Sequence, residues 1–175
     1  GMSKVNRHIY LIGFMGCGKT SVSIAMNQLY GKNIVEVDDR IIAKEGRSIN
    51  QIFAESGENY FRDLETEMLK ELADEDNIIV SCGGGMVLRE ENRRLMKENG
   101  VIIWLDATPE TILDRVKDDD SRPNLKGKKN VKDIKALKNK RADAYAEAAD
   151  IKVDTDGKTI REVAKEIYES VNRTR

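Results

Sequence analysis

Gly13-Phe14-Met15-Gly16-Cys17-Gly18-Lys19-Thr20 is the stretch that decides the fold of this chain. It fits the eight-residue pattern of a phosphate-binding loop, in which one glycine opens the loop and Gly-Lys-Thr closes it. The apolar run at 9–12 directly precedes it and predicts a short buried strand. A helix beginning near Lys19 would add the positive end of its dipole to the loop's backbone N–H groups. The stretch therefore predicts a nucleotide-phosphate site between a strand and a helix.

The closing residues of the loop have defined expected roles. Lys19 would neutralise the β- and γ-phosphates of the nucleotide, and the Thr20 hydroxyl would ligate Mg²⁺. The other nucleotide contacts of the loop are expected from Gly13, Met15, Gly16, Cys17, Gly18 and Ser21. The alternative is a glycine-rich turn without a ligand, but the constrained positions and both flanks agree with a phosphate loop. The pattern does not identify the phosphate acceptor.

Length and charge exclude several classes of protein. The 175 residues suit one α/β domain, and 30 Lys and Arg against 31 Asp and Glu give a formal net charge of −1. No overall basic field therefore points to nucleic acid or to a membrane surface. No apolar run approaches the roughly 18–20 residues of a membrane span, and no signal-peptide pattern is present, so we expect a cytoplasmic protein.

Strand and helix patterns alternate along the rest of the chain. Apolar runs predict further strands at 34–37, 78–81, 101–105 and 151–153. Periodic apolar stripes and capping signals predict helices between and after them, at 21–30, 39–45, 48–53, 57–72, 88–99, 108–116, 131–148 and 159–171. This alternation predicts an α/β fold in which helices cover both faces of a five-stranded parallel sheet.

Three acidic residues, Glu36, Asp38 and Asp39, follow the second predicted strand. A single aspartate there could cap the next helix, but three exceed what a cap requires. In an open parallel sheet, ligands bind outside the carboxyl ends of the strands. We therefore expect these carboxylates to face Mg²⁺ and the acceptor.

Three later features each allow a structural and a functional interpretation. Arg62 could form intrahelical ion pairs or bind an anion. The glycines in Cys82-Gly83-Gly84-Gly85 could form a flexible turn or let a ligand approach the backbone. The charged segment 117–129 could be a surface loop or a lid that closes over nucleotide.

The two cysteines and the single histidine form no metal or disulfide pattern. Cys17 and Cys82 could be buried packing residues, or Cys17 could be a reactive thiol close to Lys19. His8 begins the first strand, where a structural or solvent-facing role is expected. A carboxylate must then serve as general base.

Six motifs follow one another in the order found in shikimate kinases, a family in the nucleoside-monophosphate-kinase branch of phosphate-loop folds. They are GFMGCGKT at 13–20, GRSI with a following IF at 46–53, GENYFRDLE at 57–65, SCGGG at 81–85, SRPNL at 121–125 and KRADAY at 140–145. The resemblance covers residues 9–168. It implies a three-layer fold with strand order 2-3-1-4-5 in one kinase domain, 1–175. A helical shikimate-binding region at about 38–66 and a lid at about 117–129 would belong to that domain.

The resemblance also implies the activity, which is ATP-dependent phosphorylation of the 3-hydroxyl of shikimate in aromatic amino acid biosynthesis. The substrates would be ATP and shikimate, the cofactor Mg²⁺ and the enzyme a monomer. A kinase of another small hydroxy acid such as gluconate, a nucleoside-monophosphate kinase and an inactive nucleotide-binding module remain the alternatives. The arginines and the triple glycine favour shikimate.

Carried over by position, the family's site residues fall into four groups. The shikimate-binding residues are Asp38, Arg62, Gly83, Gly84, Gly85 and Arg141. The catalytic residues are Lys19, Asp38 and Arg122, with Asp38 orienting the hydroxyl or accepting its proton and Arg122 reaching the transferred phosphate from the lid. The adenine-flanking residues are Arg115 and Lys158. The metal residues are Thr20 and Glu36, and Glu36 stands where the family usually has aspartate.

The chemistry of the acceptor agrees with these positions. Arginine offers a carboxylate two parallel hydrogen bonds, which lysine cannot, so Arg62 and Arg141 suit the carboxylate of shikimate. The Asp38 carboxylate suits its hydroxyl groups.

Overall fold

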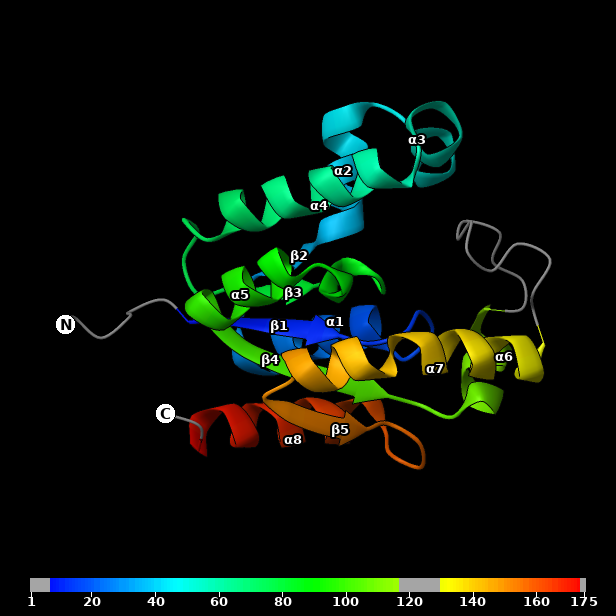
Figure 1. Cartoon of the computed structure of the whole chain (residues 1–175). Helices are drawn as coiled ribbons and strands as arrows, with labels where there is room; N and C mark the ends of the chain where they lie inside the picture. Colours follow the sequence, from blue (N-terminus) through cyan, green and yellow to red (C-terminus); the bar gives the residue numbers. More distant parts are fainter. Residues whose placement is uncertain (1–6, 117–129, 174–175) are drawn as a thin grey trace.

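The computed structural model describes residues 7–116 and 130–173. Five strands form one parallel sheet in the order β2-β3-β1-β4-β5, which confirms the predicted order (Figure 1). They are β1 His8–Ile12, β2 Ile34–Glu36, β3 Ile79–Ser81, β4 Gly100–Asp106 and β5 Ile151–Asp154. The predicted lid at 117–129, with Arg122 and the SRPNL motif, lies outside the described residues.

The helices follow the predicted alternation. They are α1 Lys19–Tyr30, α2 Val37–Glu45, α3 Ile49–Ser56, α4 Glu58–Leu72, α5 Glu90–Asn99, α6 Pro109–Val116, α7 Val131–Ala148 and α8 Ile160–Arg173, with a 3₁₀ turn at Met86–Leu88. Sequence signals explain several starts. Ser48 and Gln51 form a capping box before α3, and Thr108 accepts a hydrogen bond from the N–H of Thr111 in α6.

Most boundaries differ from the prediction by one to three residues, and two of the differences change an element near the site or its start. The strand expected at 34–37 ends at Glu36, because Val37 already belongs to α2 and is fully buried there. Asp38 and Asp39 consequently lie in the first turn of α2, where a negative charge favours the helix dipole, while Glu36 takes the N-cap position. The helix expected from 88 begins at Glu90, after the 3₁₀ turn.

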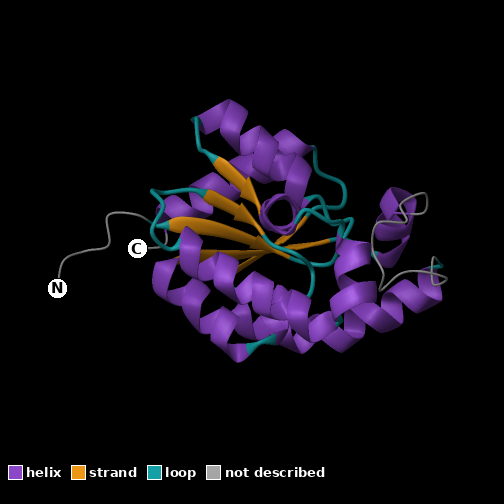
Figure 2. Cartoon of the chain, turned by 90° about the horizontal axis from the view of Figure 1, so that it is seen from above, coloured by secondary structure: helices purple, strands orange, loops and turns teal. Residues whose placement is uncertain are grey.

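The sheet buries apolar side chains on both faces, as the alternating residues of β1 illustrate. Ile9 and Leu11 pack with the helices α1 and α8 on one face. Tyr10 and Ile12 pack on the other face with α4, α5 and the end of α7. Figure 2 shows helices on both sides of the strands. Each large apolar side chain buried in this way stabilises the fold by about 1.5–3 kcal/mol.

His8 has a structural role in this core. It is buried, its Nδ1 accepts a hydrogen bond from the N–H of Ile78 at 3.1 Å, and its Nε2 lies 2.8 Å from the carbonyl oxygen of Leu72. The side chain thus ties the start of β1 to the end of α4 and to the residue before β3.

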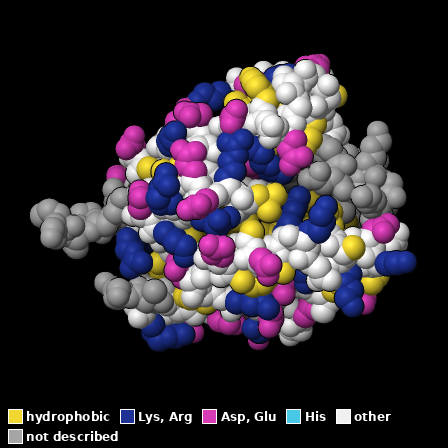
Figure 3. Space-filling view, viewed as in Figure 1, with side chains coloured by type: hydrophobic (Ala, Val, Ile, Leu, Met, Phe, Trp, Pro, Cys, Tyr) yellow, Lys and Arg dark blue, Asp and Glu magenta, His cyan; other side chains and the backbone are white. Residues whose placement is uncertain are grey.

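Charged side chains of both signs are interspersed over the face seen in Figure 3, without one dominant basic area. Among the residues that the structure describes, no helix is both long and apolar enough to cross a bilayer. The helices α2, α3 and α4 lie beyond the β2 edge (Figure 1). The loops after β1 and β3 and the start of α2 meet at the carboxyl end of the sheet. The candidate site lies there.

Candidate functional site

A cavity of about 330 Å³ opens where these loops meet. Its volume is at the lower end of the range for small-molecule sites. Fourteen of the residues predicted for the site line it: Met15, Gly16, Gly18, Lys19, Thr20, Ser21, Glu36, Asp38, Arg62, Gly83, Gly84, Gly85, Arg115 and Arg141. The fold therefore brings the expected nucleotide, metal and acceptor residues into one cavity.

The phosphate loop has the backbone that its glycines predict. Gly13 has a φ of 143°, and a side chain there would collide with the carbonyl oxygen of Leu105. Gly18 has a φ of 102° in the N-cap position of α1, a conformation that favours glycine. The Lys19 ammonium donates to the carbonyl oxygens of Gly13 and Phe14 at 2.5 and 3.2 Å. The backbone of the phosphate loop thus holds the Lys19 side chain.

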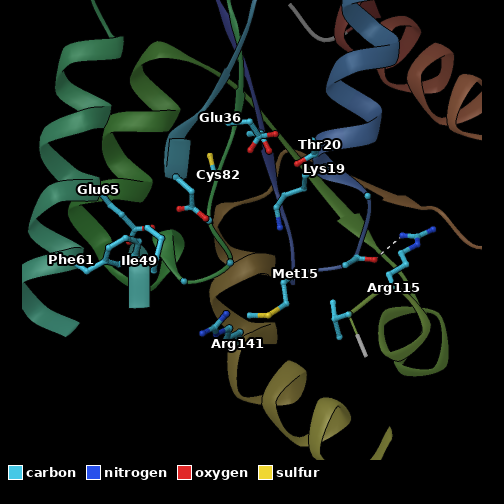
Figure 4. Close-up of a pocket in the computed structure, with 18 of the residues that line it drawn as sticks. Met15, Lys19, Thr20, Glu36, Ile49, Phe61, Glu65, Cys82, Arg115 and Arg141 are labelled. Carbon is cyan, nitrogen blue, oxygen red and sulfur yellow. Dashed lines mark hydrogen bonds between the residues drawn. The ribbon is translucent and has the colours of Figure 1, made fainter. Parts of the chain in front are cut away.

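Oxygen atoms gather at one end of the cavity. Figure 4 shows Glu36 and Thr20 close together there, with Lys19 beside them. Glu36 Oε1 is buried and has no hydrogen-bond partner. A buried carboxylate oxygen and a hydroxyl oxygen are ligands that suit Mg²⁺, so these residues fit the ion. Within the described residues no three His, Cys, Asp or Glu side chains form a metal-binding group.

Arg62 is buried in α4 and lines the cavity, 7% exposed. Its Nη1 donates to Glu65 Oε1 at 2.7 Å, and its Nη2 lies 3.2 Å from Glu58 Oε2. Burial opposes the charge of Arg62, but Glu65 and Glu58 outweigh it and the pKa of the guanidinium is raised. The intrahelical pairs expected as an alternative role therefore form, and the guanidinium still faces the cavity.

Glu65 is the charged lining residue that the sequence interpretation missed. Its side chain is fully buried, and burial raises the pKa of the carboxyl to about 7, although Arg62 opposes the shift. Its Oε2 has no hydrogen-bond partner and would lie 3.0 Å from a side chain at Gly83. The spacing of three residues between Arg62 and Glu65 could have indicated this position, but it was interpreted only as an intrahelical ion pair.

Arg141 reaches the same region from α7. It is 6% exposed, its guanidinium carbon lies 5.7 Å from the centre of the Phe14 ring, and its Nη1 has no hydrogen-bond partner. A side chain at Gly84 would meet Arg141 Nη1 at 2.9 Å, and one at Gly85 would meet Arg62 Nη1 at 2.8 Å. Two buried guanidinium groups thus flank adjacent glycines, an arrangement that favours a carboxylate.

The glycine segment also adjoins the phosphate loop. A side chain at Gly84 would lie 3.6 Å from the carbonyl oxygen of Gly13 and 3.7 Å from the backbone nitrogen of Met15. An anion held by the arginines would therefore lie next to a phosphate held by the loop. That adjacency is the geometric requirement of phosphoryl transfer between the two.

The two residues predicted to flank the adenine, and Gly13, occupy different places. Arg115 lines the cavity and donates to the carbonyl oxygen of Gly16 at 2.7 Å (Figure 4). Lys158 does not line it and forms an ion pair with Glu166 at 2.9 Å. Gly13 shapes the loop from outside the cavity.

The Cys17 side chain is 1% exposed and packs into the apolar core, not into the cavity. The structure therefore supports its packing role over the reactive thiol. Cys82 lines the cavity but is also 1% exposed, and burial raises the pKa of its thiol.

Comparisons with known proteins agree on one family. The family model described as shikimate kinase matches residues 15–172. The chain is 47% identical to the shikimate kinase of Persephonella marina over 161 residues, which covers 92% of this chain and 96% of the relative. Among solved structures, shikimate kinase from Acinetobacter baumannii in complex with shikimate is similar with a TM-score of 0.91 and 30% identity, covering 97% of this chain and 95% of that one. Shikimate kinase from Aquifex aeolicus is similar with a TM-score of 0.81 and 40% identity, covering 95% and 97%.

Proposed function

This chain belongs to the shikimate kinase family, which phosphorylates shikimate with ATP in aromatic amino acid biosynthesis, and we propose that the transfer takes place in the cavity described above. The observation that carries the proposal is the pair of buried guanidinium groups beside the glycine segment, next to the phosphate loop. The carboxylate of a small hydroxylated acid would neutralise the positive charge of the two guanidinium groups, and its ring would fit in the space beside the glycines.

Arg62 and Arg141 bind the carboxylate of shikimate, and Gly83, Gly84 and Gly85 let its ring lie against the backbone. Arg62 is oriented for this role by its ion pair with Glu65, which fixes one edge of the guanidinium. Arg141 Nη1 is available to the ligand because no group of the described residues accepts its hydrogen bonds. Burying a guanidinium nitrogen without a hydrogen-bond partner is unfavourable, so a bound carboxylate that accepts from Arg141 Nη1 would be stabilising.

Asp38 acts at the reacting hydroxyl. It lies in the first turn of α2 and lines the cavity, near where a side chain at Gly83 would point. The 3-hydroxyl oxygen forms a bond to the γ-phosphorus, the bond to the oxygen bridging the β- and γ-phosphates breaks, and the hydroxyl proton passes to the Asp38 carboxylate. ADP and shikimate 3-phosphate are the products.

The phosphate loop holds ATP, with Lys19 turning from the loop carbonyls to the β- and γ-phosphates. Arg115 lies beside the loop, where it would flank the adenine. We assign Lys158 to the adenine as well, and Arg122 to the transferred phosphate. Thr20 and Glu36 would hold Mg²⁺, which neutralises phosphate charge when it is bound.

A coupled ADP-release assay with different acceptors tests this function. ATP and Mg²⁺ are supplied with shikimate, gluconate or a nucleoside monophosphate, and each rate is compared with the rate without acceptor. We expect release above background only with shikimate. A higher rate with either of the other acceptors would reassign the substrate, and no acceptor-dependent release would indicate a nucleotide-binding module.

A further inference from the structure

Tyr145 connects α7 to the glycine segment. It lies one helical turn after Arg141 and is 2% exposed. Its hydroxyl donates a hydrogen bond of 2.6 Å to the carbonyl oxygen of Gly84. Its ring packs on Trp104 of β4, with the ring centres 5.6 Å apart and the planes inclined by 39°. The phenol therefore reaches from a well-packed core position to the backbone that lines the cavity.

The glycine segment needs external support because it has no side chains of its own. The carbonyl oxygens of Gly83 and Gly85 accept hydrogen bonds from the N–H groups of Met86 and Leu88 at 3.2 and 3.1 Å. The carbonyl oxygen between them, that of Gly84, accepts from the Tyr145 hydroxyl instead. The orientation of the central peptide of the segment therefore depends on a side chain 61 residues away in the sequence.

Gly84 is also the glycine that lies beside both the acceptor residue Arg141 and the phosphate loop. A side chain there would contact Arg141 Nη1 and the backbone of the phosphate loop. A rotation of this peptide would change the space between Arg141 and the loop. Tyr145 and Arg141 lie on consecutive turns of α7. This helix therefore fixes the position of the Arg141 guanidinium relative to the Gly84 carbonyl group.

We propose that Tyr145 is a positioning residue for the acceptor, whose hydroxyl fixes the Gly84 peptide against Arg141 and so shapes the surface on which shikimate lies. The inference rests on the proposed function, because it assigns this surface to shikimate. Tyr145 does not line the cavity, so it acts through Gly84 and Arg141 and not on the reacting atoms.

The hydroxyl keeps its proton over the working pH range. Burial raises the pKa of Tyr145, although the nearby Arg141 guanidinium opposes the shift. A phenol that stays protonated remains a hydrogen-bond donor to Gly84 throughout. The contribution of Tyr145 to shikimate binding should consequently be the same at pH 6.5 and pH 8.5.

Tyr145→Phe tests the proposal, because it keeps the ring on Trp104 and removes only the hydroxyl, which donates to Gly84 and also interacts with the Arg141 guanidinium. Tyr10→Phe is the matched control, since Tyr10 is buried in the same apolar cluster, 1% exposed, and also carries a phenol hydroxyl. In the described residues no hydrogen bond joins Tyr10 to Gly83, Gly84 or Gly85. Initial rates are measured with shikimate and ATP varied separately, and the melting temperature is recorded for each protein.

We expect Tyr145→Phe to raise the shikimate KM about 3- to 10-fold, as loss of one buried hydrogen bond predicts, with the ATP KM and kcat changed less than about twofold. Tyr10→Phe should leave the shikimate KM unchanged. An unchanged shikimate KM in Tyr145→Phe would overturn the proposal, as would equal rises in both KM values or an equal effect of Tyr10→Phe. If the wild type does not phosphorylate shikimate, the proposed function fails first, and that result is distinct from all of these.

Discussion

Gly85→Ala should displace the Arg62 guanidinium from its position in the acceptor site without changing the backbone conformation. Gly85 has φ −102° and ψ 3°, a conformation open to alanine. The new methyl carbon would lie 2.7 Å from Arg62 Cζ and 2.8 Å from Nη1, and would also overlap Nη2. Since carbon contacts are favourable near 3.5–4.0 Å, the guanidinium must move by about 1 Å. The moving atoms end a flexible side chain, so the fold should survive.

The expected loss follows from the hydrogen bonds that Arg62 can no longer make. A charge-assisted hydrogen bond contributes about 1.5–3 kcal/mol, and 1.4 kcal/mol corresponds to a factor of ten. The shikimate KM should therefore rise roughly 10- to 100-fold in a coupled ADP-release assay, with the ATP KM within about twofold. The melting temperature should move by only a few degrees, because the entropy that alanine removes from the unfolded chain, about 0.4–1 kcal/mol, offsets local crowding.

A double-mutant cycle with Arg62→Ala separates this explanation from a general effect of the methyl group. If the methyl acts by displacing the guanidinium, Gly85→Ala should add little to the defect of Arg62→Ala. Equal and additive effects of the two substitutions would refute the reasoning, as would a Gly85→Ala enzyme with normal shikimate KM.

Two further predictions concern the carboxylates. Asp38→Asn should lower kcat on the order of 10²-fold or more if Asp38 accepts the proton, and a variant that keeps most of its kcat would leave Asp38 with binding only. Glu65 has a pKa raised from 4.5 to about 7 in the folded chain, so its stabilising contribution is fully present below pH 4.5 and is lost as pH rises through about 7. The free energy of unfolding of the wild type should therefore fall relative to Glu65→Gln between pH 4.5 and pH 8 in urea titrations, and a constant difference between the two proteins would contradict the assignment.

Local motifs predicted much of the fold and the site. The strand before Gly13 and the helix after Thr20 follow from the phosphate-loop pattern, and the capping box at Ser48 follows from a spacing of three residues. The strand order and the proximity of Arg62 and Arg141 were predicted only from the resemblance to a family, because neither follows from local spacing in the sequence.

Contacts between distant segments explain what the sequence did not predict. Glu65 acquires its raised pKa only because α4 packs beside Gly83 and Asp38 and excludes water. The hydrogen bond from Tyr145 to Gly84 likewise depends on how α7 lies on the sheet. The second strand also ends one residue early, since Val37 begins α2 and is buried there although its β-propensity favours a strand.

The most direct test of the central claim is calorimetric titration of shikimate into the wild type, Arg62→Lys and Arg141→Lys. Lysine keeps the positive charge but loses the two parallel donors that a carboxylate requires. Each variant should bind shikimate at least about tenfold more weakly, while its affinity for ATP with Mg²⁺ stays within about twofold. Unchanged shikimate affinity in both variants would contradict the claim that these arginines hold the acceptor.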